Sequence, residues 1–151
     1  LRSFRLILNV RMLRQIKRFG QSRPKTWLIG FCLWFLSLWF LSSGTPAPEN
    51  TPNIPHLDKI AHFGFFFGGG GLFCAWLSHQ FENCKRLQSI VITTLIGSLV
   101  GVIDEYHQTF TPGRSGNDLG DWTADTLGSL TGAIVMVFVL KYTSPADPQS
   151  E

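Results

Sequence analysis

Residues 101–132 read GVIDEYHQTFTPGRSGNDLGDWTADTLGSLTG, a stretch with five carboxylates and one arginine that lies between two apolar runs. Each flanking run is long enough to cross a bilayer as a helix. Carboxylates within or at the ends of membrane helices are energetically expensive, so they commonly mark a functional site. The stretch therefore predicts both a membrane fold and the place of its polar site.

The apolar residues, 44% of a chain of 151 residues, are concentrated in four blocks. These blocks are 26–43, 60–78, 87–103 and 123–140. Each is close to the about 20 residues that span hydrocarbon as a helix. The helices of a soluble bundle would alternate apolar and charged faces, whereas 87–103 contains no charge. We expect an all-α membrane protein with four transmembrane helices.

The basic residues predict the orientation of these helices. Residues 1–25 contain eight Lys or Arg and no acid, and Lys85 and Arg86 follow the second block. By the positive-inside rule, both segments are cytoplasmic. Four spans then place both termini in the cytoplasm and leave 44–59 and 110–121 outside. The expected arrangement is that of a multi-pass membrane protein.

The chain is expected to have three parts: a basic cytoplasmic or interfacial segment (1–25), the membrane domain (26–141) and a cytoplasmic tail (142–151). The basic segment suits either a helix in the inner headgroup layer or a solvated topology signal. A cleaved signal peptide is disfavoured, because no small-x-small pattern follows the apolar core. Nucleic acid is not an expected partner, since the basic excess adjoins a membrane helix. Three widely spaced cysteines support neither a disulfide framework nor a cysteine-based zinc site.

Glycine pairs with G-x-x-x-G spacing occur in the last three blocks and predict how these helices pack. They are Gly64 and Gly68, Gly97 and Gly101, and Gly128 and Gly132. This spacing lets helix backbones approach closely in lipid. We expect the last three helices to form the tight core, with the aromatic-rich first helix against it or facing lipid.

Polar residues from the last three helices are expected at one depth near the outer surface. Asp58 and His62, Asp104 and Gln108, and Asp121 and Asp125 are i,i+4 pairs, and each pair shares a helix face. They predict an outward-facing pocket. The candidate binding residues are Asp58, Lys59, His62, Asp104, Glu105, Gln108, Arg114, Asp121 and Asp125.

Other roles are open for some of these carboxylates. Asp118 and Asp121 could cap the fourth helix, and Asp58 could cap the second. Asp104 and Glu105 lie at a helix C-terminus, where the dipole disfavours anions, so a positive group must compensate them.

The outer cluster contains six acids against Lys59 and Arg114. Either some carboxylates are protonated, or a cation completes the site. Mg²⁺, Ca²⁺ or Mn²⁺ would suit carboxylates, and His62 would also permit Zn²⁺. Because the spacing matches no known metal signature, we prefer a salt-bridge network centred on Arg114. We therefore assign no metal ligands and no cofactor from sequence.

Three motifs in this order resemble the VanZ-like family, named for a protein associated with teicoplanin resistance. They are DKIAHF at 58–63, DEYHQTFTPGRS at 104–115 and DWTADTLGSLTG at 121–132. The resemblance covers about residues 28–141. Asp125 departs from the pattern, since many relatives carry Asn there. The resemblance implies a multi-pass protein of the bacterial plasma membrane that is connected with the cell envelope or with antibiotic resistance, but no settled reaction.

Two functions follow as expectations. The first is a protein without catalytic activity whose pocket binds a lipid-linked cell-wall precursor, a glycopeptide or another cationic ligand. The second is an intramembrane hydrolase or transferase that acts on lipid-linked headgroups, with or without the help of a metal, for which Asp104, Glu105 and His62 are the catalytic candidates. A small transporter is a third reading, although four helices are few for one.

Overall fold

The computed structural model describes residues 24–44, 56–81 and 83–142, which form four long helices. These helices are α2 (Pro24–Ser42), α3 (Leu57–Gln80), α4 (Arg86–Gln108) and α5 (Leu119–Tyr142). All four are long and apolar enough to span a membrane, as predicted. The predictions for most of the basic segment and for the tail concern residues outside these ranges.

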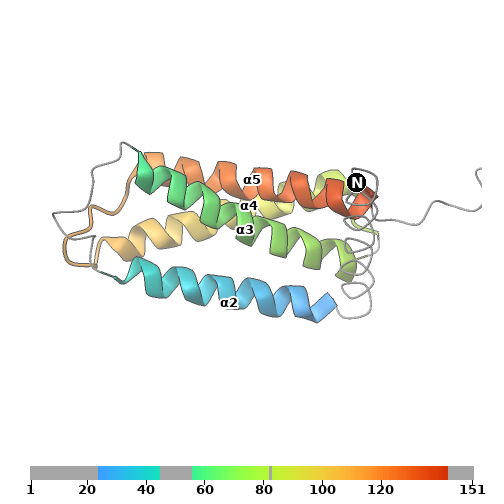
Figure 1. Cartoon of the computed structure of the whole chain (residues 1–151), viewed down its shortest axis with the longest axis horizontal. Coiled ribbons are helices and arrows are strands. Elements are labelled where there is room, and N and C mark those ends of the chain that lie inside the picture. The colour runs from blue at the N-terminus through green and yellow to red at the C-terminus, as the bar shows by residue number, and fades with distance from the viewer. Residues whose placement is uncertain (1–23, 45–55, 82, 143–151) are drawn as a thin grey trace, which may run out of the picture.

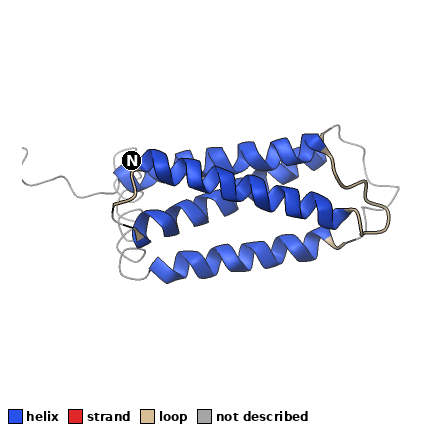
Figure 2. Ribbon diagram, turned by 180° about the vertical axis from the view of Figure 1, so that it is seen from behind, coloured by secondary structure: helices blue, strands red, loops and turns tan. Residues whose placement is uncertain are grey.

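The helices run alternately up and down, so that each lies antiparallel to its neighbour in sequence (Figures 1 and 2). At one end of the bundle α2 and α4 end, and α3 and α5 begin. We call this the site end. The helices extend beyond the apolar blocks there: α3 begins at Leu57, α4 continues to Gln108 and α5 begins at Leu119. The predicted polar residues therefore lie mostly on rigid helix ends.

Glycines determine how closely α5 packs against its neighbours. A Cβ at Gly132 would lie 3.0 Å from the backbone nitrogen of Gly71, and one at Gly128 would lie 3.1 Å from the carbonyl carbon of Phe63. The α3–α5 contact is the most extensive in the bundle. The predicted Gly128–Gly132 pair is thus confirmed as a packing surface, because no larger residue fits there.

The other two predicted pairs have opposite outcomes. Gly97 and Gly101 face the side chains of Ser129 and Asp125, so α4 approaches α5 as expected. A Cβ at Gly64 or Gly68 would meet nothing within 4 Å, and the prediction for this pair is wrong. The neighbouring glycines 69–71 are the buried ones. The close approach of α3 therefore uses the face next to the predicted one.

Helix α2 packs mainly on α3, through aromatic rings. Trp34 donates an indole N–H bond to the Phe65 carbonyl at 3.0 Å, and its ring meets that of Phe66 edge to face. Gly69 leaves the space that the Trp34 ring occupies. Much of the rest of α2 is exposed, as expected for a helix that faces lipid.

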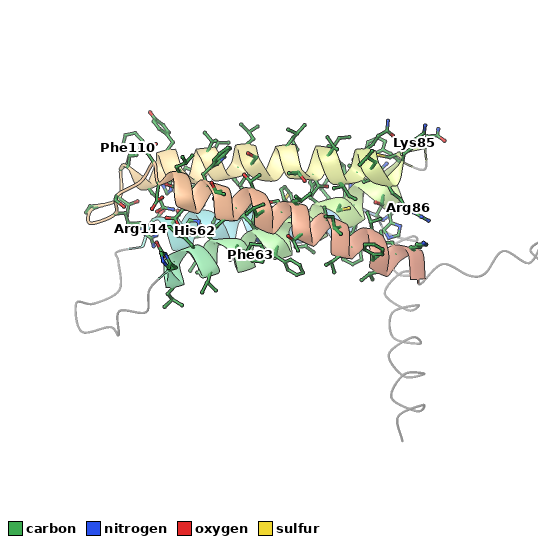
Figure 3. All side chains as sticks on the ribbon, turned by 90° about the horizontal axis from the view of Figure 1, so that it is seen from above. His62, Phe63, Lys85, Arg86, Phe110 and Arg114 are labelled. Carbon is green, nitrogen blue, oxygen red and sulfur yellow. The ribbon has the colours of Figure 1, made fainter. Side chains whose placement is uncertain are left out.

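The orientation of the bundle stays a prediction, which cysteine labelling tests. Lys85 and Arg86 lie at the opposite end from His62 and Arg114 (Figure 3). In a variant without the native cysteines, Ser115→Cys at the site end should react with a membrane-impermeant thiol reagent in intact cells. Asn83→Cys, exposed at the other end, should react only after permeabilisation. The reverse pattern would contradict the predicted orientation.

Candidate functional site

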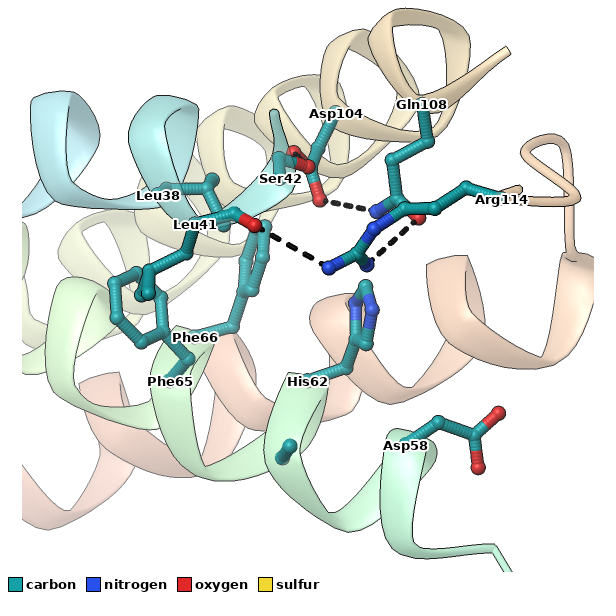
Figure 4. A pocket seen from close by; sticks show the side chains of 11 residues that line it. Leu38, Leu41, Ser42, Asp58, His62, Phe65, Phe66, Asp104, Gln108 and Arg114 are labelled. Atoms are coloured by element: carbon teal, nitrogen blue, oxygen red, sulfur yellow. Dashed lines mark hydrogen bonds between the residues drawn. The ribbon is translucent and has the colours of Figure 1, made fainter. Parts of the chain in front are cut away.

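The site end contains a cavity of about 290 Å³ between α2, α3 and α4 (Figure 4). One side of its lining is apolar and the other is polar. The apolar side consists of Leu38, Leu41, Ala61, Phe65 and Phe66. The polar side consists of Ser42, Asp58, His62, Asp104, Gln108 and Arg114. Two of the predicted i,i+4 pairs, one on α3 and one on α4, thus face the same space.

Asp104 is held at the wall of this cavity by two hydrogen bonds. Ser42 donates its hydroxyl to Asp104 Oδ1, and Gln108 donates Nε2–H to Oδ2 at 3.0 Å. Gln108 in turn accepts a bond from Arg114 Nη1 at 3.3 Å. Arg114 is therefore linked to Asp104 by a hydrogen-bond chain through the Gln108 amide (Figure 4).

Arg114 completes the end of α2. Its Nε donates to the Gly44 carbonyl and its Nη2 to the Leu41 carbonyl, both at 3.2 Å, and Thr111 donates to the Ser42 carbonyl. The last carbonyls of a helix have no partner within the helix, and a cation is favoured beside them. The loop after α4 thus caps a helix that precedes it by about 70 residues in sequence.

The counter-charge of the outer carboxylates is Lys59, and the predicted network centred on Arg114 is wrong. Lys59 Nζ lies 2.9 Å from Asp58, 3.0 Å from Asp118 and 3.0 Å from Asp121. These ion pairs join the first turn of α3 to the start of α5. The three hydrogen bonds of Arg114 go instead to the Gly44 and Leu41 carbonyls and to Gln108, and none of them goes to these acids.

Asp118 has the capping role that sequence allowed. It directly precedes α5, and its Oδ1 accepts the Gly120 N–H at 2.7 Å. The hydrogen bond from Lys59 and this backbone bond lower the pKa of Asp118 below its usual 3.8. Asp118 is therefore ionised at neutral pH, with its charge directed at both Lys59 and the start of α5.

Deeper in the bundle, His62 and Asp125 form a pair across the α3–α5 contact. His62 Nδ1 and Asp125 Oδ1 lie 2.9 Å apart, and Asp125 is fully buried. Asp125 is thus paired with His62, and Gly101 provides space for its other oxygen.

Glu105 is compensated by the start of α5. Its Oε2 accepts the backbone N–H of Asp118 at 2.6 Å. Together with Val102, Asn117, Asp118, Leu119 and Trp122 it lines a second cavity of about 180 Å³. The positive end of a helix thus meets an acid at the negative end of another.

The nine candidate binding residues divide into three groups. Asp58, His62, Asp104, Gln108 and Arg114 line the larger cavity, Lys59 and Asp121 form ion pairs beside it, and Glu105 and Asp125 are buried behind it. Sequence analysis missed Ser42 and Thr111. Their partners are a carboxylate and a carbonyl more than 60 residues away, and a hydroxyl at the end of an apolar helix gives no signal of such a contact.

Four helices long and apolar enough to span a membrane, with a cavity between α2, α3 and α4 at one end, define a polytopic membrane protein. A family model described as VanZ/LLP1 matches residues 2–140, and the chain belongs to the VanZ/LLP1 family. The match begins upstream of the three motifs and takes in most of the basic segment. No curated protein and no solved structure matches the chain significantly.

Arg114→Lys should destabilise the protein, because one ammonium cannot reproduce a fork that reaches two carbonyls and an amide. Loss of two charged hydrogen bonds should lower the free energy of unfolding by about 2–4 kcal/mol. Unfolding of the purified protein in mixed micelles measures this. Arg86→Lys, at an exposed position of the other end, is the matched control. Equal stability of the two variants would refute the capping role.

Lys59→Met should reverse the effect of acid on stability. In the wild type the lowered pKa of Asp118 stabilises the fold above pH 3.8, and this contribution is lost as the pH falls through the folded-state pKa. Without Lys59 three adjacent carboxylates repel one another, so protonation should raise the melting temperature. Lys25→Met, exposed near the start of α2, should behave like the wild type. A fall on acidification in both variants would contradict the Lys59 cluster.

Proposed function

We propose that this protein binds the polar headgroup of a lipid-linked envelope component in the larger cavity, at the outer face of a bacterial plasma membrane. The observation that carries the proposal is the two-sided lining of a cavity at the end of a membrane bundle. An amphiphile needs polar groups for its head and an apolar path for its chain, and this lining offers both.

The dimensions of the cavity suit a headgroup. Its volume of about 290 Å³ lies at the lower end of the range for small-molecule sites, so a whole lipid does not fit inside. Leu41 lines the cavity and is also 60% exposed on the surface of α2. A lipid chain can therefore continue from the cavity along the exposed apolar face of this helix.

The charges of the lining suggest which headgroup fits. Among the described residues, Arg114 and His62 are the basic side chains of the lining, and the three hydrogen bonds of Arg114 go to neutral oxygens. Its charge therefore remains available to a phosphate. Asp58 and Asp104 suit the amino or hydroxyl groups of the same headgroup. The same acids also suit a cationic glycopeptide such as teicoplanin, which is therefore a second candidate ligand. The family is named for a protein associated with teicoplanin resistance.

An enzymatic role is the second candidate, and the contact between His62 and Asp125 favours it. A histidine oriented by a buried carboxylate is a common arrangement for proton transfer. Asp104 lies on the same cavity wall, where it could act as a base on a lipid-linked headgroup. On this alternative the protein is a hydrolase or transferase, with Asp104, Glu105 and His62 as its catalytic candidates.

Native mass spectrometry with a polyprenyl phosphate tests the binding proposal. The purified protein should retain the polyprenyl phosphate and release the matching polyprenol, because only the phosphate engages Arg114. Leu41→Trp should reduce retention about tenfold or more by filling the cavity mouth, a loss of about 1.4 kcal/mol. Leu33→Trp is the control, since Leu33 is 59% exposed on the same helix but does not line the cavity.

Equal retention by the two tryptophan variants would contradict binding in this cavity, and retention of teicoplanin alone would favour the glycopeptide. Asp104→Asn separates the binder from the enzyme. A binder should retain the anionic polyprenyl phosphate at least as well as the wild type does, because the variant removes a negative charge from the lining. An enzyme should convert the bound lipid in the wild type and lose that conversion completely in the variant, with the fold intact.

A further inference from the structure

Three carboxylates at the site end are buried and have no ion pair with a lysine or arginine among the residues that the structure describes. Asp104 and Glu105 are 4% exposed, and Asp125 is 0% exposed. Lys59 is engaged with the outer acids, and Arg114 with carbonyls and Gln108. Of the three, only Asp125 has an ion-pair partner among the described residues, which is His62. Buried negative charge of this kind requires a proton or a cation.

Two oxygens in this group also lack a hydrogen-bond partner. Glu105 Oε1 and Asp125 Oδ2 are buried and have none among the residues that the structure describes. The second oxygen of each carboxylate is held, Glu105 Oε2 by the Asp118 N–H and Asp125 Oδ1 by His62. Each side chain is thus fixed in place while one oxygen stays available. Buried polar atoms without a partner are rare and call for an explanation.

We propose that His62, Asp104 and Glu105 bind a divalent metal cation, which neutralises this buried charge. One ligand atom from each residue lies within 4.8 Å of the other two, which is close enough for the three to converge on one ion. His62 lies on α3, and Asp104 and Glu105 are consecutive residues of α4. This proposal does not depend on which lipid, if any, enters the cavity.

Asp125 is the positioning residue of this site. With Nδ1 of His62 hydrogen-bonded to Asp125 at 2.9 Å, Nε2 is the nitrogen that can coordinate the ion. A carboxylate behind the distal nitrogen of a ligand histidine fixes the ring and raises its basicity. Ser42 and Gln108 hold Asp104 in the same way. The supporting contacts are therefore built around all three ligands.

The ligand set indicates the kind of metal. Two carboxylates and one imidazole suit Mn²⁺ or Zn²⁺ better than Ca²⁺, which prefers oxygen ligands alone. Because His62 and Asp104 also line the larger cavity, a ligand in the cavity can reach the ion.

A second acidic group provides a contrast within the same protein. Asp58, Asp118 and Asp121 also bring ligand atoms within 4.8 Å of one another. However, the Lys59 ammonium binds all three at 2.9–3.0 Å and already supplies the positive charge. We therefore expect no metal there.

Binding of Mn²⁺ to the purified full chain in detergent, followed by the loss of the free-ion electron paramagnetic resonance signal, tests the proposal. The wild type should bind one equivalent with saturation, and Zn²⁺ should displace it. Bound Mn²⁺ should also raise the melting temperature, since the unfolded chain has no such site. Glu105→Gln, which keeps the shape of the side chain, should weaken binding about tenfold or more.

The matched control is Asp118→Asn, which removes one acid from the Lys59 cluster and should leave Mn²⁺ affinity unchanged. Absence of a saturable site in the wild type overturns the proposal and means that protons neutralise the buried carboxylates. Equal affinities of Glu105→Gln and Asp118→Asn also overturn it. Since no lipid is added, these results are independent of the polyprenyl phosphate experiment.

Discussion

The close approach of α3 and α5 is the constraint on which the rest of the site depends. In lipid there is no hydrophobic driving force between helices, so their association depends on close packing of the backbones. Gly128 and Gly132 allow that contact against the carbonyls of Phe63 and Phe67. His62 precedes one contact residue directly, and Asp125 lies one turn before the first glycine. Backbone packing therefore sets the distance between the histidine and its carboxylate.

The charged groups at the site end are divided between two depths. The outer layer is a closed ion-pair cluster, in which Lys59 serves Asp58, Asp118 and Asp121. The inner layer contains acids that are fixed by neutral donors and by one histidine. Because exposed ion pairs contribute little and buried charge is expensive, the two layers have different physical roles. The outer one joins helices, whereas the inner one contains the two carboxylate oxygens that lack a hydrogen-bond partner among the described residues.

Much of this arrangement could be predicted from sequence. Block length predicted the four helices, and the i,i+4 spacing placed Asp58 with His62 and Asp104 with Gln108 on the cavity side. Residue spacing does not identify the buried face where several faces of a helix carry the same residue type. The run of glycines at 68–71 offers several equivalent helix faces, and only the neighbouring helices decide which one is buried.

Arg114 illustrates a second limit of sequence analysis. An arginine among six acids suggests salt bridges, yet its partners are backbone carbonyls at the end of α2. Every residue has such a carbonyl, so no residue type signals it. The contact of Thr111 was not predicted for the same reason, because its partner is the Ser42 carbonyl. Contacts to backbone groups across long sequence separations require the packed structure.

The capping of α2 by the loop after α4 has a consequence for synthesis in the cell. When α2 enters the membrane, the residues that complete its last turn have not yet been made. Its terminal carbonyls can stay hydrated in the headgroup layer, since they lie at the end of the span. They gain Arg114 and Thr111 only after α3 and α4 have followed. The end of α2 is thus capped only after a segment about 70 residues later in the chain has been translated.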